Sequence, residues 1–376
     1  MRVDTDAGIT GWGESYISWY APEVFRALIE HFGPVVEGED PFDIHALWRK
    51  MQVKALRWAP VGPSISALGG VEIALWDILG KALGAPVYQL LGGKAHDELR
   101  CYTSIANANK PQAQRLVDEG YSALKVAHVG EMLQERHISI PDLISQERAK
   151  VEAMREVLGE SVDLILDPGM PFNRKPWLAD TALRVVRALD EYQLLWMEQP
   201  VLQTNVDDYV RIRELCETPL AAGENETLLH GYKPFFEKRA IDIVQPDATW
   251  CGGIGEDMKI MAAADAHDMR IVTHSFSSAV GLAANYHVGF ANRNCFMVRY
   301  PEKDNPFGKA LIGQAFEFED GYIKPTGAPG LGIEIPDELI EEYPFVPNSG
   351  ISHARSPFPR PTDPKWSPSN LDIASW

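Results

Sequence analysis

The feature that most constrains the fold of this 376-residue chain is a regular alternation of short apolar runs with longer amphipathic segments. The apolar runs lack the alternating polar residues of a sheet that has one face in water. Continuous apolar strands, each followed by a helix, are typical of a parallel sheet buried on both faces. Eight such runs occur, at residues 101–106, 123–127, 162–167, 194–200, 219–224, 242–247, 270–274 and 295–300.

Helical periodicity marks the segments between these runs. In residues 145–158, for example, Val151, Met154 and Leu158 fall on one face of a helix. Eight strand-and-helix units closed on themselves form a barrel that occupies about 250 residues. Here the units extend over roughly residues 100 to 325. We therefore predict an α/β fold that contains a TIM-type barrel and a second, smaller domain.

The second domain is predicted from the chain on either side of the barrel. The turn at residues 6–8, between strand-like residues, predicts a hairpin. A helix follows the loop at 59–63, with Ser64 or Ser66 as its N-cap and Gly84 as its stop signal. The division that we expect is a capping domain at 1–95, a barrel at 96–322, and a segment at 323–376 that returns to the capping domain and ends in a proline-rich tail.

Composition narrows the classes of partner. The formal net charge of −18 would repel the phosphates of a nucleic acid. No run approaches the roughly 18 apolar residues of a membrane helix, and the N-terminus lacks the basic-then-apolar order of a signal peptide. The four cysteines show no metal-type spacing and fit reduced thiols in a cytosol. We expect a cytoplasmic protein that binds a small molecule and neither nucleic acid nor membrane.

Five of the apolar runs end in an ionisable residue, namely Asp167, Glu198, Glu224, Asp247 and His274. The gaps between them are 31, 26, 23 and 27 residues, each about one strand plus one helix. In a barrel this spacing brings the five side chains to one mouth, formed by the C-terminal ends of the strands, where barrel active sites lie. A single carboxylate of this kind is commonly only a helix cap, but five in register favour an active site.

The order of these residues also suggests their chemistry. Asp167, Glu198 and Glu224 form a set of hard oxygen ligands that favours Mg²⁺ first and Mn²⁺ second. Asp247 and His274 follow on adjacent strands. A carboxylate bound to one imidazole nitrogen raises the basicity of the other nitrogen, so this pair suits a general base near neutral pH.

Several motifs, in the same order along nearly the whole chain, resemble those of the mandelate racemase subgroup of the enolase superfamily. The resemblance implies a modified (β/α)₇β barrel with an α+β capping domain, Mg²⁺ held by the three carboxylates, and an Asp247–His274 acid/base dyad. It further implies removal of a proton α to a carboxylate, with the metal stabilising the negative charge, and a homo-oligomer, either dimer or octamer. The motifs are LILDPGM, LLWMEQP, AAGENE, DIVQPDATWCGG, IVTHSFSS, VEIALWDILGKALGAPVYQLLGG and GAPGLGIEI.

Departures from the family pattern narrow the choice among the reactions of the subgroup. Racemases of the subgroup typically show Lys-x-Lys on the second barrel strand, whereas this chain has Lys125 followed two residues later by Ala127. Some dehydratases carry Asp-x-His on the third strand, where Gly169 replaces the histidine here. His274 therefore remains as the one strong acid/base, which suits a syn elimination, and Lys125 is assigned to the substrate carboxylate. The chain looks most like acid-sugar dehydratases, L-rhamnonate dehydratases in particular, which form 2-keto-3-deoxy acids.

Four further residues are candidates for substrate contacts. Arg299 stands where the family usually has a glutamate, and Glu302 follows three residues later. His128 lies near the expected mouth, where it either contacts the substrate or is only an exposed loop residue. Trp58 either closes over the mouth or packs between the domains. Family members usually begin with another strand and a mobile loop, so we expect the usual first strand and lid loop to be missing here.

Three alternatives stay open. One is another reaction of the same superfamily, such as racemisation, epimerisation or cycloisomerisation. A second makes Lys125 the Schiff-base lysine of a class I aldolase, although the carboxylate trio argues against a mechanism that needs no metal. The third is a catalytically silent protein that binds a metal or a sugar acid without turnover.

Overall fold

The computed structural model describes residues 1–127, 138–170, 176–300 and 306–342. Eight parallel strands form a barrel in chain order, and the last of them pairs with the first to close it. Each predicted apolar run overlaps one of these strands, so the predicted barrel is confirmed. The strands are β3 (Leu99–Ala106), β4 (Ala123–Ala127), β5 (Asp163–Asp167), β6 (Trp196–Glu198), β7 (Leu220–Ala222), β8 (Ile243–Val244), β9 (Arg270–Thr273) and β10 (Cys295–Arg299).

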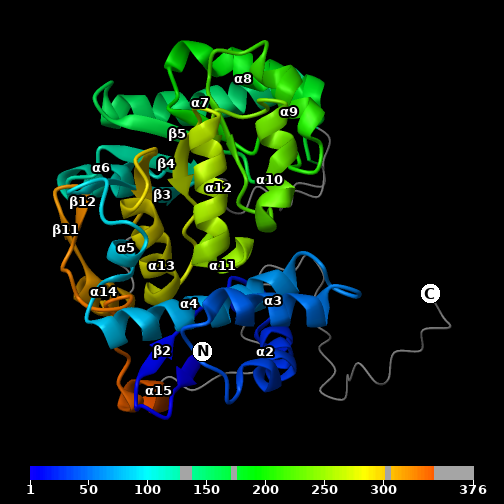
Figure 1. The fold of residues 1–376 in the computed structure, drawn as a ribbon. Coiled ribbons are helices and arrows are strands. Elements are labelled where there is room, and N and C mark those ends of the chain that lie inside the picture. Colours follow the sequence, from blue (N-terminus) through cyan, green and yellow to red (C-terminus); the bar gives the residue numbers. More distant parts are fainter. Residues whose placement is uncertain (128–137, 171–175, 301–305, 343–376) are drawn as a thin grey trace, which may run out of the picture.

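Helices cover the outside of this barrel (Figure 1). The amphipathic pattern predicts their buried faces well, because α7 buries Val151, Met154 and Leu158 as expected. They are α6 (Lys110–Asp118), α7 (Ile140–Leu158), α8 (Ala179–Leu189) with the short η3 (Asp190–Tyr192), α9 (Val206–Arg213), α10 (Leu228–Glu237), α11 (Ala248–Cys251), α12 (Ile254–Ala266), α13 (Ala279–Phe290) and α14 (Pro306–Ala315). The hairpin of β11 (Phe316–Glu319) and β12 (Tyr322–Pro325) then pairs antiparallel with the start of β3.

The interior of the barrel is layered, and the layers set the position of the polar residues. One apolar layer takes a side chain from every strand: Tyr102, Ala123, Ile165, Trp196, Ala221, Ile243, Val272 and Met297. Because strand side chains alternate, the residue two positions further along each strand points into the same interior. Those positions hold Ser104, Lys125, Asp167, Glu198, Gly223, Gln245, His274 and Arg299. A polar layer thus lies directly next to the apolar layer, on the side of the C-terminal ends of the strands.

The N-terminal part of the chain forms a region outside the barrel. The strands β1 (Arg2–Asp4) and β2 (Thr10–Trp12) pair antiparallel, which confirms the predicted hairpin. Figure 1 shows the long helix α4 between the barrel and α2. The helices are α1 (Ile17–Tyr20), α2 (Pro22–Val36), α3 (Ile44–Ala55), α4 (Pro63–Leu83) and α5 (Val87–Leu90), with α15 (Asp337–Glu342) beside β1. The exact domain boundaries stay a prediction.

The start of α4 differs from the prediction. Its N-cap is Gly62, at a φ of 73°, and Pro63 is the first helical residue, so the predicted serine cap is wrong. Proline suits the first helical position because its φ is already helical, and glycine tolerates the left-handed backbone before it. The Ser66 hydroxyl instead donates to the carbonyl oxygen of Thr249, at 2.7 Å, and so ties α4 to the barrel.

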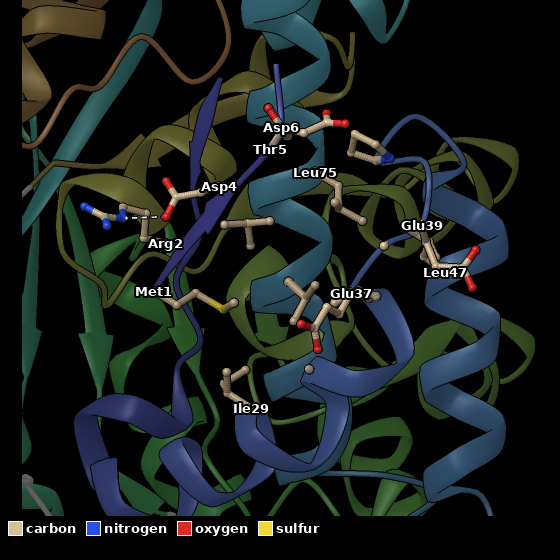
Figure 2. Close-up of a pocket in the computed structure, with 16 residues that line it drawn as sticks. Met1, Arg2, Asp4, Thr5, Asp6, Ile29, Glu37, Glu39, Leu47 and Leu75 are labelled. Atoms are coloured by element: carbon tan, nitrogen blue, oxygen red, sulfur yellow. Dashed lines mark hydrogen bonds and ion pairs between the residues drawn. The ribbon is translucent and has the colours of Figure 1, made fainter. Parts of the chain in front are cut away.

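A pocket of about 500 Å³ opens in the N-terminal region (Figure 2). Its lining includes Met1 and Val3 of β1, Ile29 of α2 and Leu75 of α4. None of the ionisable residues at the ends of the barrel strands lines it, so it is separate from the predicted active site. Within the described ranges, no helix combines the length and the apolar character that crossing a membrane requires.

Candidate active site

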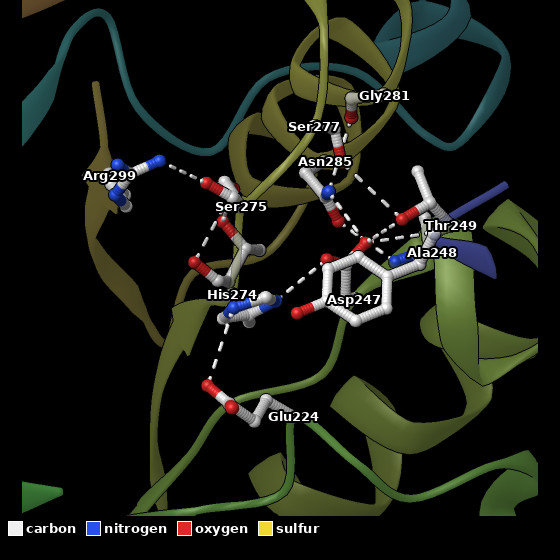
Figure 3. A network of polar contacts seen from close by, with 12 residues as sticks. Glu224, Asp247, Ala248, Thr249, His274, Ser275, Ser277, Gly281, Asn285 and Arg299 are labelled. Carbon is white, nitrogen blue, oxygen red and sulfur yellow. Dashed lines mark hydrogen bonds and ion pairs between the residues drawn. The ribbon is translucent and has the colours of Figure 1, made fainter. Parts of the chain in front are cut away.

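Asp247 and His274 meet at the barrel mouth, as the sequence predicts (Figure 3). His274 Nδ1 lies 2.8 Å from Asp247 Oδ2. A carboxylate oxygen only accepts, so Nδ1 carries a proton, and in the neutral ring Nε2 holds the lone pair. Nε2 faces Glu224, whose Oε2 is 3.3 Å away. The imidazole is therefore oriented by one carboxylate and turned towards another.

Electrostatics favour the protonated form of this histidine. Burial by itself would lower the pKa of His274, but the Glu224 carboxylate and the hydrogen bond to Asp247 outweigh burial and raise that pKa above its ordinary value. For Glu224 the neutral form is favoured instead. Its own pKa is raised by burial and by the negative charge of Glu198, although His274 works against the rise.

Asp247 is held by more than the histidine. It lies at the N-terminus of α11, and its Oδ1 accepts from the Thr249 backbone N–H at 2.8 Å and from the Thr249 hydroxyl at 2.7 Å. The Asn285 side-chain amide of α13 donates to the same oxygen at 2.9 Å. Three donors on Oδ1 leave Oδ2 for His274, so the carboxylate has one orientation.

Lys125 lies between two of the acidic residues. Its Nζ is 3.1 Å from Asp167 Oδ2 and 2.5 Å from Glu198 Oε1. Burial would lower the pKa of Lys125, but the charges of Glu198 and Asp167 raise it well above its ordinary value. This lysine is therefore a fixed cation in the polar layer.

Glu198 is the most buried of the three carboxylates that are predicted to hold a metal. Besides Lys125, the Gln245 amide donates to its Oε2 at 2.9 Å and the Trp196 indole N–H at 3.1 Å. Burial would raise the pKa of Glu198, yet Lys125 and these donors lower it. Glu198 thus stays ionised inside the barrel.

The donor set fits a hard divalent cation in its chemistry. Asp167, Glu198 and Glu224 end or follow β5, β6 and β7, which are neighbours in the barrel, and the mutual repulsion of Glu198 and Glu224 indicates unbalanced negative charge. In the present arrangement, however, no three His, Cys, Asp or Glu side chains of the described residues come together closely enough to hold a metal ion. The carboxylates would have to converge further than they do here.

The proposed substrate contacts have different surroundings. Arg299 ends β10 in the polar layer, and its Nη1 donates to the Ser275 carbonyl oxygen at 2.7 Å, next to His274 (Figure 3). Trp58 lies between α3 and α4, 57% exposed, with its ring edge-on to His31 of α2. His128 and Glu302 fall outside the described residues.

Several members of this polar network are not predicted from the sequence. Asn285 and Gln245 do not end an apolar run, and Trp196 looks like core packing. For Thr249 a signal existed, because an aspartate that begins a short helix commonly accepts from the backbone two or three residues later. For Asn285 no local signal exists, since it meets Asp247 only through the packing of α13.

Comparisons with known proteins agree with this architecture. Residues 109–339 match the enolase C-terminal domain-like family, and residues 1–92 match the mandelate racemase / muconate lactonizing enzyme N-terminal domain. A D-galactonate dehydratase of Variovorax paradoxus is 32% identical over 387 residues, with 100% of this chain and 96% of that protein covered. A D-xylonate dehydratase of Haloferax volcanii is 32% identical over 358 residues, with 91% and 84% covered.

A solved structure shows the same fold. It is the 3,6-anhydro-D-galactonate cycloisomerase of Zobellia galactanivorans, with a TM-score of 0.81, 26% identity, and 91% of this chain and 92% of that one covered. The matched domains span most of the chain, and the barrel and its polar layer agree with them. The protein therefore belongs to the mandelate racemase / muconate lactonizing enzyme family of the enolase superfamily.

Proposed function

We propose that this protein is a metal-dependent sugar-acid dehydratase, which converts an aldonate or aldarate into its 2-keto-3-deoxy acid. The observation that carries the proposal is the His274–Asp247 dyad, whose Nε2 faces Glu224 in the barrel interior. Asp167 and Glu198 pair with the buried Lys125 in the same interior. The dehydratase names of the two curated relatives support the same reaction class. Their printed substrates are D-galactonate and D-xylonate, so the sugar itself stays a prediction.

His274 is proposed to move the proton. Its Nε2 lone pair takes the proton from the carbon α to the substrate carboxylate, and Asp247 stabilises the imidazolium that forms. The imidazolium then returns this proton to the departing β-hydroxyl, which leaves as water on the same face. The remaining enol rearranges to the 2-keto-3-deoxy acid, so the net change is the loss of one water molecule.

Asp167, Glu198 and Glu224 are proposed to hold Mg²⁺. When bound, the ion would stabilise the negative charge that develops on the carboxylate oxygens of the substrate. Lys125 and Arg299 supply positive charge in the same layer, and we propose that they orient the substrate carboxylate. Lys125 is well placed for this role because its ammonium group stays charged.

The same property of Lys125 argues against the aldolase alternative. A Schiff-base lysine must be neutral to attack a carbonyl carbon. Lys125 is instead paired with Asp167 and Glu198, which raise its pKa well above the ordinary value. The carboxylates thus keep the amine protonated and unreactive.

A cycloisomerase of the same superfamily is the second candidate, because the Zobellia galactanivorans enzyme shares the fold at a TM-score of 0.81. Both reactions start with abstraction of a proton next to a carboxylate. They differ in what leaves, since only the dehydratase releases water. Product analysis therefore separates them.

The test is an activity screen of aldonates and aldarates with Mg²⁺, read by semicarbazide detection of 2-keto-3-deoxy products. Removal of the metal with EDTA should abolish turnover, and added Mg²⁺ should restore it. Turnover that survives EDTA would reject metal dependence. An isomeric product without loss of water would favour the cycloisomerase.

The metal ligands can be tested without turnover. Glu198→Gln should weaken Mg²⁺ binding in calorimetry by at least about tenfold, because it removes one charged ligand. Glu226→Gln is a matched control, since this carboxylate is two residues after Glu224 but accepts from Gln203 instead. Equal Mg²⁺ affinity in wild type and Glu198→Gln would show that the ligand assignment is wrong.

A further inference from the structure

A tyrosine of the N-terminal region lies against the dyad from outside the barrel. Tyr16 immediately precedes α1, and its ring packs edge-to-face on the His274 imidazole, with 5.5 Å between ring centroids and 84° between planes. The Tyr16 ring also meets Trp250 and Phe276 edge-on, at 5.7 and 6.3 Å. Trp250 lies in α11, which follows Asp247, and Phe276 lies in the loop that follows His274. Tyr16 therefore packs on His274 itself and on one aromatic residue from each of the two segments that follow the dyad residues.

The backbone around Tyr16 is fixed to α11 and to the start of α13. The Tyr16 N–H donates to the carbonyl oxygen of Thr249, at 3.0 Å. Two residues earlier, the Glu14 carboxylate accepts from the backbone N–H groups of Ser278 and Gly281 at the start of α13, both at 2.8 Å. A carboxylate at a helix N-terminus is a favourable contact because it satisfies free N–H groups there. The ring thus approaches His274 from a rigid support.

The hydroxyl of Tyr16 is occupied elsewhere. It forms a hydrogen bond of 2.9 Å with the Tyr20 hydroxyl, at the other end of the short helix α1. The part of Tyr16 that meets the imidazole is therefore its ring, and the hydroxyl bond helps to set the ring's angle.

A histidine ring needs such a contact. Rotation about the bond between Cβ and the imidazole is a broad torsion with no sharp minimum. The bond from Nδ1 to Asp247 fixes one ring nitrogen but still allows the ring to tilt about that bond. An aromatic ring packed perpendicular to the imidazole removes this tilt and so fixes the direction of the Nε2 lone pair.

We propose that Tyr16 is a positioning residue for the proposed dehydration, which holds the His274 imidazole in the plane required for proton transfer. The expected effect of Tyr16 on kcat rests on the proposed function, whereas its effect on the orientation of the His274 ring does not. The N-terminal region would thereby complete the dyad, although every proposed catalytic side chain comes from the barrel.

The test compares Tyr16→Leu, Tyr16→Phe and a matched control. The control is Tyr88→Leu. It removes a tyrosine that stacks on another buried histidine, His287, with 5.6 Å between ring centroids, and His287 has no role in the proposed proton transfer. Tyr16→Leu should lower kcat about 10- to 100-fold with little change in KM, because small errors in geometry slow proton transfer strongly. Tyr16→Phe should restore most of the lost kcat, and Tyr88→Leu should leave kcat unchanged.

Nitrogen-15 NMR of the histidine rings supplies a readout that does not need turnover. In Tyr16→Leu the ring signals of His274 should broaden, because the imidazole can then tilt about its hydrogen bond to Asp247, whereas Tyr88→Leu should leave these signals in place. An unchanged His274 spectrum in a folded Tyr16→Leu protein would overturn the inference. So would equal losses of kcat in the Phe and Leu variants, because the hydroxyl would then be the active part. If the wild type shows no dehydration, the proposed function fails, and the NMR result still decides the role of Tyr16.

Discussion

Two buried histidines, close together in the sequence, have opposite electrostatic properties. His274 follows β9 and lies between Asp247 and Glu224, which raise its pKa despite burial. His287 lies in the last turn of α13, where the Tyr88 N–H donates to its Nδ1 at 3.2 Å and two aromatic rings cover it. Burial lowers the pKa of His287 to about 4. The difference shows that burial alone makes a histidine neutral, and that carboxylate partners turn a buried histidine into a base.

The largest expected effect comes from removing the base itself. His274→Asn should lower kcat by about 10²- to 10⁴-fold, because this is what positioned proton transfer typically contributes. Mg²⁺ binding, measured by calorimetry, should remain. His287→Gln should keep kcat close to the wild-type value, because this histidine has no carboxylate partner among the described contacts. Comparable loss in both variants would remove the functional distinction between the two histidines.

The second largest effect is the pH dependence that His287 gives to the free energy of unfolding. Its folded pKa of about 4 lies below the ordinary value of 6.5, so between these values the unfolded state binds more protons than the folded state. The stabilising contribution is therefore complete above pH 6.5 and is lost as the pH falls through 4. The loss is on the order of 3 kcal/mol.

Chemical denaturation across this pH range measures the effect. His287→Gln keeps an acceptor for the Tyr88 N–H but does not titrate, so its unfolding free energy should fall less steeply between pH 6.5 and 4. Parallel curves for wild type and variant would show that His287 is protonated normally in the folded protein.

The smallest effect concerns the support of the dyad. Asn285→Ala removes one donor from Asp247 and the acceptor of the Ala248 N–H, so kcat should fall about tenfold and the unfolding free energy by about 1–3 kcal/mol. Asn292→Ala, just beyond the same helix, is the control, because its amide binds the Val288 carbonyl oxygen away from the site. Steady-state kinetics compare the two, and an unchanged kcat in Asn285→Ala would show that Thr249 suffices to orient Asp247.

Local patterns in the sequence predict much of this protein because the underlying forces are local. An apolar run long enough for a strand must be buried on both faces, and an amphipathic segment after it must cover that strand. This is why the strands that carry Lys125 and Asp167, and the position of His274 after β9, follow from the chain alone. The start of α4 was missed because two different local signals compete there, and a serine is a weaker one than Gly62 followed by Pro63.

The barrel, the family and the five ionisable residues at the ends of its strands can all be predicted from the chain alone. The partners of these residues depend on how the chain packs in three dimensions. Lys125 between Asp167 and Glu198, Asn285 behind Asp247, and Tyr16 against His274 are contacts between elements distant in the chain. Periodicity fixes which face of an element is buried, but the partner of a side chain depends on how whole elements pack, and so does the pKa of a buried group.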